Sequence, residues 1–206
     1  MSKKNKILLI FGFILVFFGL FVLRGNEDDW ICQNGEWIKH GNPSAEMPIG
    51  LCPGALIESF EDCVKAGNPV MESYPRQCRS GENFFVEGIG NELEKMDLIR
   101  LDNPRPNQVL KSPLVIRGEA RGTWFFEAVF PIVLTDWDGR IIAQSYATAK
   151  GDWMTEDFVQ FEGILEFENP ENIGDFSRRG ALILQKDNPS GLPEHDDALE
   201  ISIRFE

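Results

Sequence analysis

The sequence lacks the signatures of an enzyme. It has only two histidines, His40 and His195, and it contains no Gly-x-Ser-x-Gly elbow, phosphate-binding loop or paired-histidine metal motif. A Ser–His or Cys–His nucleophile needs a histidine beside it, so such an active site is disfavoured. Among the 33 acidic residues no pair stands out for glycoside hydrolysis. We therefore expect a non-enzymatic protein without catalytic residues, cofactor or resident metal.

Positive charge is also scarce. The chain has 20 Lys and Arg residues against 33 Asp and Glu, for a formal net charge of −13. The first 24 residues hold four of the bases and none of the acids, so the +4 of this stretch leaves −17 for the rest. Such an acidic body repels phosphate backbones and anionic lipid surfaces. We therefore expect that the protein does not bind nucleic acid.

Long apolar runs are absent except for one, Ile7–Leu23, which follows Lys3, Lys4 and Lys6. As a helix rising about 1.5 Å per residue it would be roughly 26 Å long, close to the about 30 Å of a bilayer core. The run ends without the small residues of a cleavage site, which favours an uncleaved signal anchor over a removed signal peptide. The lysines predict that residues 1–6 are cytoplasmic. We expect a single-pass cell-membrane protein whose remaining domains are extracytoplasmic.

Cysteine is confined to residues 26–87, which we interpret as a small cysteine-rich module containing Cys32, Cys52, Cys63 and Cys78. An even number of clustered cysteines in an exported chain predicts two disulfides. Three pairings are possible, and the sequential one is favoured because each pair brackets its own turn-rich segment. Closing a loop of about 15 residues stabilises by roughly 3 kcal/mol in the chain-entropy model. No cysteine pair has the close spacing of a zinc knuckle.

Two tryptophans, Trp30 and Trp37, flank the first cysteine. Asn34-Gly35 between them is a hairpin signal, so both side chains could lie on one face. Together with Trp137 they are the candidate ligand-binding residues, as stacking surfaces for a carbohydrate or a partner. The alternative is that Trp30 and Trp37 cover a miniature core.

The rest of the module predicts a short helix and an extended return to Cys78. Ser59 followed by Asp62 is a helix start, Gly67 is a helix stop, and Phe84–Val86 is a short strand. The strings Trp-x-Cys-x-x-Gly-x-Trp-x-x-His-Gly-x-Pro and Gly-Asn-Pro-Val-Met-Glu-Ser-Tyr-Pro-Arg-Gln-Cys resemble motifs of uncharacterised bacterial membrane-anchored or secreted proteins. This resemblance implies an architecture and no activity.

Residues 88–97 are polar and glycine-containing, and we expect a linker there. Residues 98–206 alternate short apolar runs with turn residues, which is typical of an all-β sandwich. Seven strands are expected: Ile99–Leu101, Leu114–Ala120, Ala128–Thr135, Ile141–Ala149, Val159–Phe167, Ala181–Gln185 and Leu199–Phe205. Pro131 predicts a sheet edge or a bulge.

Without a cysteine, packed aromatic side chains must join the two sheets of this sandwich. A large side chain contributes roughly 2–3 kcal/mol when it is fully buried, so a few suffice. The candidates are Trp124, Phe126, Phe130, Trp153, Phe158, Phe161 and Phe167.

Several strings between Leu98 and Phe205 carry a resemblance: Ser112-Pro113-Leu114-Val115-Ile116-Arg117-Gly118-Glu119-Ala120, Trp124-Phe125-Phe126-Glu127-Ala128, Gly151-Asp152-Trp153-Met154 and Phe161-Glu162-Gly163-Ile164-Leu165-Glu166-Phe167. This half of the chain resembles the immunoglobulin-like domain of bacterial spore-germination and other cell-surface proteins. The resemblance implies a β-sandwich used in adhesion or assembly, with no catalytic residues. A germination role does not follow, because a fold does not fix a function.

Two acidic motifs could be mistaken for cation sites. Asp136-x-Asp138-Gly139 begins like a calcium loop, but Ile141 and Ile142 follow where further oxygen ligands would be needed, so a hairpin turn is favoured. The run from Glu194 to Asp197 is read as a solvated loop, with calcium as the alternative.

These observations favour a membrane-anchored, extracytoplasmic binding or assembly protein that presents its immunoglobulin-like domain to another envelope protein. One alternative is a module that binds a cell-wall polymer or polysaccharide through its tryptophans. The other is a protease-inhibitor-like module that presents the Cys63–Cys78 loop.

Overall fold

The computed structural model describes residues 28–33, 36–48, 52, 56–171 and 174–206. The chain divides into two compact units, Met1–Glu87 and Gly88–Glu206. The expected anchor Ile7–Leu23 lies outside the described residues. Within the described ranges, no helix has both the length and the apolar character needed to cross a bilayer.

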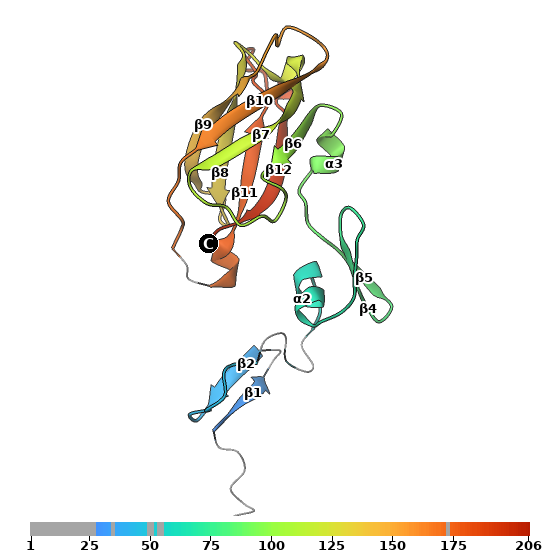
Figure 1. The fold of residues 1–206 in the computed structure, drawn as a ribbon, viewed down its shortest axis with the longest axis vertical. Coiled ribbons are helices and arrows are strands. Elements are labelled where there is room, and N and C mark those ends of the chain that lie inside the picture. Colours follow the sequence, from blue (N-terminus) through green and yellow to red (C-terminus); the bar gives the residue numbers. More distant parts are fainter. Residues whose placement is uncertain (1–27, 34–35, 49–51, 53–55, 172–173) are drawn as a thin grey trace, which may run out of the picture. The chain divides into compact units, whose positions relative to one another are not determined.

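The first unit begins with a two-stranded antiparallel hairpin of β1, Asp29–Gln33, and β2, Glu36–His40 (Figure 1). The expected hairpin is therefore present, while its Asn34-Gly35 turn lies outside the described residues. A disulfide joins Cys32 of β1 to Cys52.

The second part of this unit packs one short helix on a small sheet. The helix α2, Phe60–Lys65, begins at Ser59, whose hydroxyl accepts a hydrogen bond from the Asp62 backbone N–H at 3.1 Å, as the sequence predicts. The antiparallel sheet holds β3, Val70–Met71, β4, Gln77–Ser80, and β5, Asn83–Val86. A second disulfide joins Cys63 of α2 to Cys78 of β4. Both disulfides thus follow the sequential pairing that was favoured.

The second unit is built on one antiparallel sheet in the order β12-β11-β8-β9-β10-β7-β6. Its strands are β6 Ile99–Asn103, β7 Leu114–Arg121, β8 Val129–Asp136, β9 Ile141–Ala149, β10 Phe158–Leu165, β11 Arg179–Gln185 and β12 Ala198–Arg204. Short 3-10 turns occur at Gly122–Trp124, Asp175–Arg178 and Pro193–His195. All seven expected strands are present, which confirms the all-β assignment.

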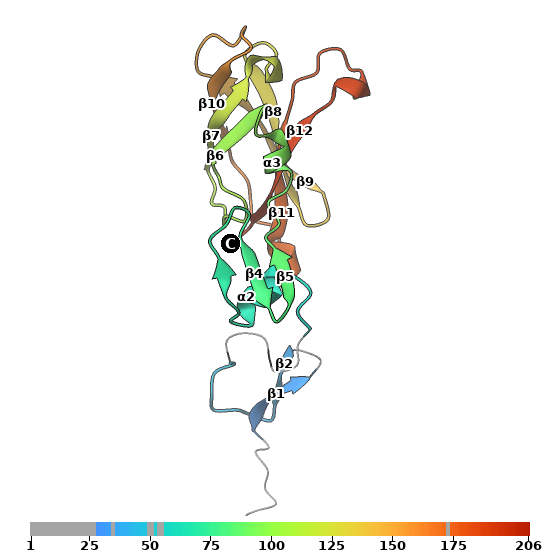
Figure 2. The ribbon, with the colours of Figure 1, turned by 90° about the vertical axis from the view of Figure 1, so that its right-hand side faces the viewer.

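The sheet folds over on itself to form the two layers of the sandwich. The side view in Figure 2 has β6, β7 and β10 on one side and β11 and β12 on the other. The link between β6 and β7 covers the β12 edge of the sheet, because the Leu110 N–H donates to the Arg204 carbonyl of β12 at 2.8 Å. The side chains between the layers form a continuous apolar core that includes Phe130, Phe161 and Trp124.

The sequence predicts Phe126 in this core, but Phe126 is exposed and its neighbour Phe125 is buried instead. Glu127 and Ala128 both have a positive φ, so the chain reverses tightly between Phe126 and Val129. This turn directs Phe125 inward and Phe126 outward, and it delays the start of β8 by one residue.

Pro131 lies within β8, an interior strand, rather than in an edge strand. Its register with β9 is regular there, and Pro131 is opposite Tyr146. The ladder between β8 and β11, however, ends at the pair Ile132 and Leu184. A residue without an N–H is tolerated at this position because no β11 residue is paired with it.

Residues 88–97, the expected linker, lie inside the second unit. They contain the short helix α3, Glu92–Lys95, which lies beside β12 (Figure 2). The Asn91 amide donates to the Ala198 carbonyl at 3.0 Å and accepts from the Glu200 N–H at 2.8 Å. Gly90 has a φ of +73°, and a Cβ there would lie 1.9 Å from the Glu200 carbonyl oxygen. The glycine that suggested flexibility is required for close packing.

Candidate functional site

The three candidate tryptophans are distributed over both units. Trp30 and Trp37 lie on the same face of the first hairpin, because Trp37 is opposite Cys32 and Trp30 is two residues away from Cys32. Both are partly buried, and the Trp30 indole donates to the Ala45 carbonyl at 2.9 Å. Trp137 belongs to the second unit, in the β8–β9 turn, with 49% of its surface exposed. The described residues bring only the first two tryptophans together.

The Asp136 motif is a hairpin turn, as predicted. One carboxylate oxygen of Asp136 accepts from the backbone N–H groups of Asp138 and Arg140, at 3.0 and 2.9 Å. The other oxygen accepts from the Arg140 side chain at 3.1 Å. Gly139 takes the left-handed conformation that closes the turn, with φ +76°. The carboxylate that would begin a calcium loop therefore binds its own turn.

The acidic run before β12 also has partners inside the protein. Asp197 forms an ion pair of 2.6 Å with Lys95 of α3, and Asp196 accepts from the Asn188 amide at 2.7 Å. Both residues border a surface pocket of about 490 Å³. Lys95 supplies the positive charge that a cation would bring, so this structure supports a loop that is tied to α3.

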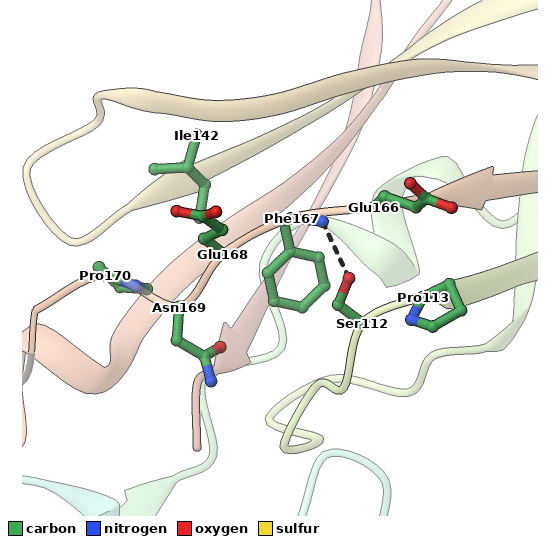
Figure 3. Close-up of a pocket in the computed structure, with 8 residues that line it drawn as sticks. All are labelled: Ser112, Pro113, Ile142, Glu166, Phe167, Glu168, Asn169 and Pro170. Atoms are coloured by element: carbon green, nitrogen blue, oxygen red, sulfur yellow. Dashed lines mark hydrogen bonds between the residues drawn. The ribbon is translucent and has the colours of Figure 1, made fainter.

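A larger surface pocket of about 680 Å³ lies where β9 and β10 separate (Figure 3). The two strands are paired only between Ala147–Ala149 and Phe161–Gly163, and they diverge beyond this point. We call this the β10-end pocket, and its lining residues are Ser112, Pro113, Ile142, Glu166, Phe167, Glu168, Asn169 and Pro170.

A β-bulge directs Ile142 into the floor of the β10-end pocket. Leu134 is paired with Ala143 but Thr135 is paired with Ile141, so Ile142 is an extra residue on β9. Bulges of this kind change the direction of a side chain. Ile142 accordingly packs against the core of the sandwich while it lines the pocket.

Phe167 forms the other apolar part of the floor. Its ring packs edge-on against Phe205, with the ring centroids 6.0 Å apart. Its backbone N–H donates to the Ser112 hydroxyl at 3.0 Å, the bond drawn in Figure 3. Phe167 is thus held by a core contact and by a hydrogen bond.

The segment after β10, residues 166–170, leaves the sheet although it continues without a turn or bend. Leu165 is the last β10 residue to pair with β7, opposite Leu114. The residue before Leu114 is Pro113, and the pairing of β7 with β10 ends at this point. Apart from the Phe167 bond to Ser112, no hydrogen bond joins residues 166–170 to another described residue. We call these five residues the open segment.

Glu166 and Glu168 of the open segment are exposed, whereas Phe167 between them is partly buried. Figure 3 shows the two carboxylates on one side of the chain and the ring on the other. Neither carboxylate has an ion pair among the described residues. Glu162 of β10 differs, because Arg117 and Lys150 bind it at 2.7 and 3.0 Å and their hydrogen bonds lower its pKa.

The geometry of the β10-end pocket is suited to binding. Among the described residues it combines an apolar floor with main-chain groups that form no hydrogen bond and two carboxylates that form no ion pair. Ser112, its only hydroxyl, accepts a backbone hydrogen bond, and no histidine lines the pocket. No nucleophile is therefore paired with a base here.

Residues 98–177 match the family described as the immunoglobulin-like domain of bacterial spore germination. The second unit carries an immunoglobulin-like domain. The expected resemblance is confirmed for this region, and the same sheet continues beyond the match through β11 and β12. Neither the curated proteins nor the solved structures contain a match to the chain.

Sequence reasoning missed the β10-end pocket as a site. The sequence predicts Glu166 and Phe167 as the end of a strand, because their alternation of polar and apolar residues matches that of β10. One signal was present in the sequence. The string Glu-Phe-Glu-Asn-Pro continues the polar–apolar alternation of β10 and then reaches a proline, which cannot donate a hydrogen bond to a neighbouring strand. The bulge at Ile142 could not be predicted from the sequence, because it depends on the pairing of β8 with β9.

Proposed function

We propose that this protein is a membrane-anchored, extracytoplasmic binding or assembly protein that presents its immunoglobulin-like domain to another protein of the cell envelope. The observation that carries the proposal is the β10-end pocket, which has an apolar floor beside unpaired main-chain groups. Main-chain donors and acceptors at a sheet margin are a recurrent means of binding another polypeptide.

Two features of the first unit agree with an extracytoplasmic location. Its disulfides, Cys32–Cys52 and Cys63–Cys78, would persist in an oxidising compartment and not in the cytosol. The apolar run Ile7–Leu23 with its preceding lysines has the composition of a signal anchor. Recovery of the protein from the cytosol with four free thiols would contradict this location.

Crosslinking in intact cells tests the binding function. A photo-crosslinking amino acid would replace Asn169 in the β10-end pocket, and a second strain would carry it at Glu156, which is also exposed. We expect the same envelope protein to be recovered repeatedly from the Asn169 strain and not from the Glu156 strain. The absence of any reproducible protein neighbour from either strain would overturn the proposal.

A polysaccharide-binding function is the second candidate, because Trp137 is exposed at 49% and could stack on a sugar ring. Co-sedimentation with isolated wall material would support it if substitution of Trp30, Trp37 and Trp137 by alanine abolished binding. The inhibitor-like alternative stays a prediction, because α2 and β3 occupy only residues 64–65 and 70–71 of the Cys63–Cys78 loop.

A further inference from the structure

The open segment has one free main-chain edge. In an extended chain, the N–H and C=O groups of successive residues point to opposite edges. The Phe167 N–H points to Ser112. The main-chain groups of Glu166 and Glu168 therefore point the other way, towards the gap that opens where β9 leaves β10. No described residue is hydrogen-bonded to them.

We infer that the β10-end pocket binds an extended polypeptide of the partner protein, which pairs antiparallel with residues 166–168 and carries a basic–apolar–basic sequence. This inference rests on the proposed function and names the chemistry of its partner. The apolar residue would lie opposite Phe167, over the floor formed with Ile142. The two basic residues would lie opposite Glu166 and Glu168, on the side where their carboxylates project (Figure 3).

Charge complementarity selects a basic occupant. Neither Glu166 nor Glu168 has an ion pair among the described residues, whereas the nearby Glu162 is bound by two cations. Opposite charges on directly facing residues of neighbouring strands stabilise their pairing, and like charges destabilise it. An acidic strand is thus disfavoured at this edge by the same groups that attract a basic one.

Synthetic peptides test the inference on the full-length protein in nonionic detergent micelles. The probe is Gly-Ser-Lys-Val-Lys-Ser-Gly, and the comparison peptide has Glu-Val-Glu at its centre. We expect the lysine peptide to shift the backbone amide NMR signals of residues 166–168, and to bind at least about tenfold more tightly than the glutamate peptide. Its affinity should fall as salt is added.

Methylated peptides test the main-chain pairing. In the antiparallel arrangement the N–H groups of both lysines face Glu166 and Glu168, while that of the valine points away. N-methylation of the two lysine nitrogens should weaken binding about tenfold, and N-methylation of the valine nitrogen should have a much smaller effect. Equal losses from the two modifications would contradict the proposed pairing.

A charge exchange provides the decisive variant. Glu166→Lys with Glu168→Lys should weaken binding of the lysine peptide about tenfold and improve binding of the glutamate peptide. The matched control, Glu156→Lys with Glu194→Lys, changes the net charge equally at exposed acids outside the pocket and should leave the preference unchanged. An unchanged preference in the Glu166 and Glu168 variant would overturn the inference.

The two proposals can fail separately. If the Asn169 crosslinker captures an envelope protein but no peptide binds at millimolar concentration, the strand-pairing inference is overturned and the binding function stands. If the crosslinker captures no protein from cells, the proposed function fails and the inference, which rests on it, is overturned as well.

Discussion

Each of the two units of this chain is stabilised internally by a different kind of interaction. In the first unit the buried cluster around α2 consists of Phe60, Cys63 and Cys78, and large apolar side chains such as Phe84 and Val86 are exposed at 54% and 56%. In the second unit a continuous core runs between two layers of sheet, and there is no cysteine. A small segment cannot bury enough apolar surface to be stable alone, so covalent bonds replace part of its core.

The second unit should therefore respond strongly to a cavity in its core. Phe130 is fully buried, and its ring lies 5.2 Å from that of Phe125 and 4.9 Å from that of Phe161. Phe130→Ala should destabilise the second unit by about 3–5 kcal/mol, through lost burial and an unfilled cavity. Hydrogen exchange followed by mass spectrometry would report the two units separately in the full chain. We expect residues 56–87 to keep their protection in this variant, and a loss there would contradict the comparison, in which the two units are stabilised by different interactions.

The first unit should depend more on its disulfides than on any one side chain. Replacing Cys63 and Cys78 together by serine should cost about 3 kcal/mol, since the bond closes a loop with a sequence separation of 15 residues. Hydrogen exchange should increase over α2 and β3–β5. The matched control is Phe130→Ala, which should leave these segments protected. If they stay protected in the serine variant, their packing suffices and the comparison between the units is wrong.

The sequence predicted the parts of each unit that depend on local patterns. The alternation of apolar residues located all seven strands of the second unit, and the pattern of Ser59 and Asp62 located the start of α2. Cysteine spacing favoured the pairing that the structure has. In each case the determining residues lie within about 20 positions of one another along the chain.

Features that depend on distant segments were not predicted. Asn91 holds residues 88–97 on β12 through a hydrogen bond across 107 positions, and nothing near Asn91 in the sequence indicates this. The open segment likewise leaves the sheet where the pairing of β10 with β7 ends, at Leu114, and the pocket floor needs a bulge set by the pairing of β8 with β9. The candidate site therefore consists of residues whose roles arise from pairing and not from a motif.

The smallest expected effect on stability concerns Glu92 of α3, near the start of the second unit. Its carboxyl is buried, which raises its pKa, while the ion pair of 2.8 Å with Arg105 lowers that pKa by less. The folded protein consequently keeps this proton at pH values where the unfolded chain has lost it. Stability contributed by this group is thus present at low pH, and it falls as the pH rises from the unfolded pKa through the raised folded pKa.

Glu92→Gln removes this titration and should leave the second unit at least as stable as the original at neutral pH, with a change of about 0.5 kcal/mol or less. Urea unfolding of the full chain between pH 4 and 8, read by hydrogen exchange over β6 and β12, would measure it. Glu94→Gln, at an exposed position of the same helix, is the matched control. A loss of several kcal/mol in Glu92→Gln would mean that the ion pair with Arg105 outweighs burial and fixes α3 to the sandwich.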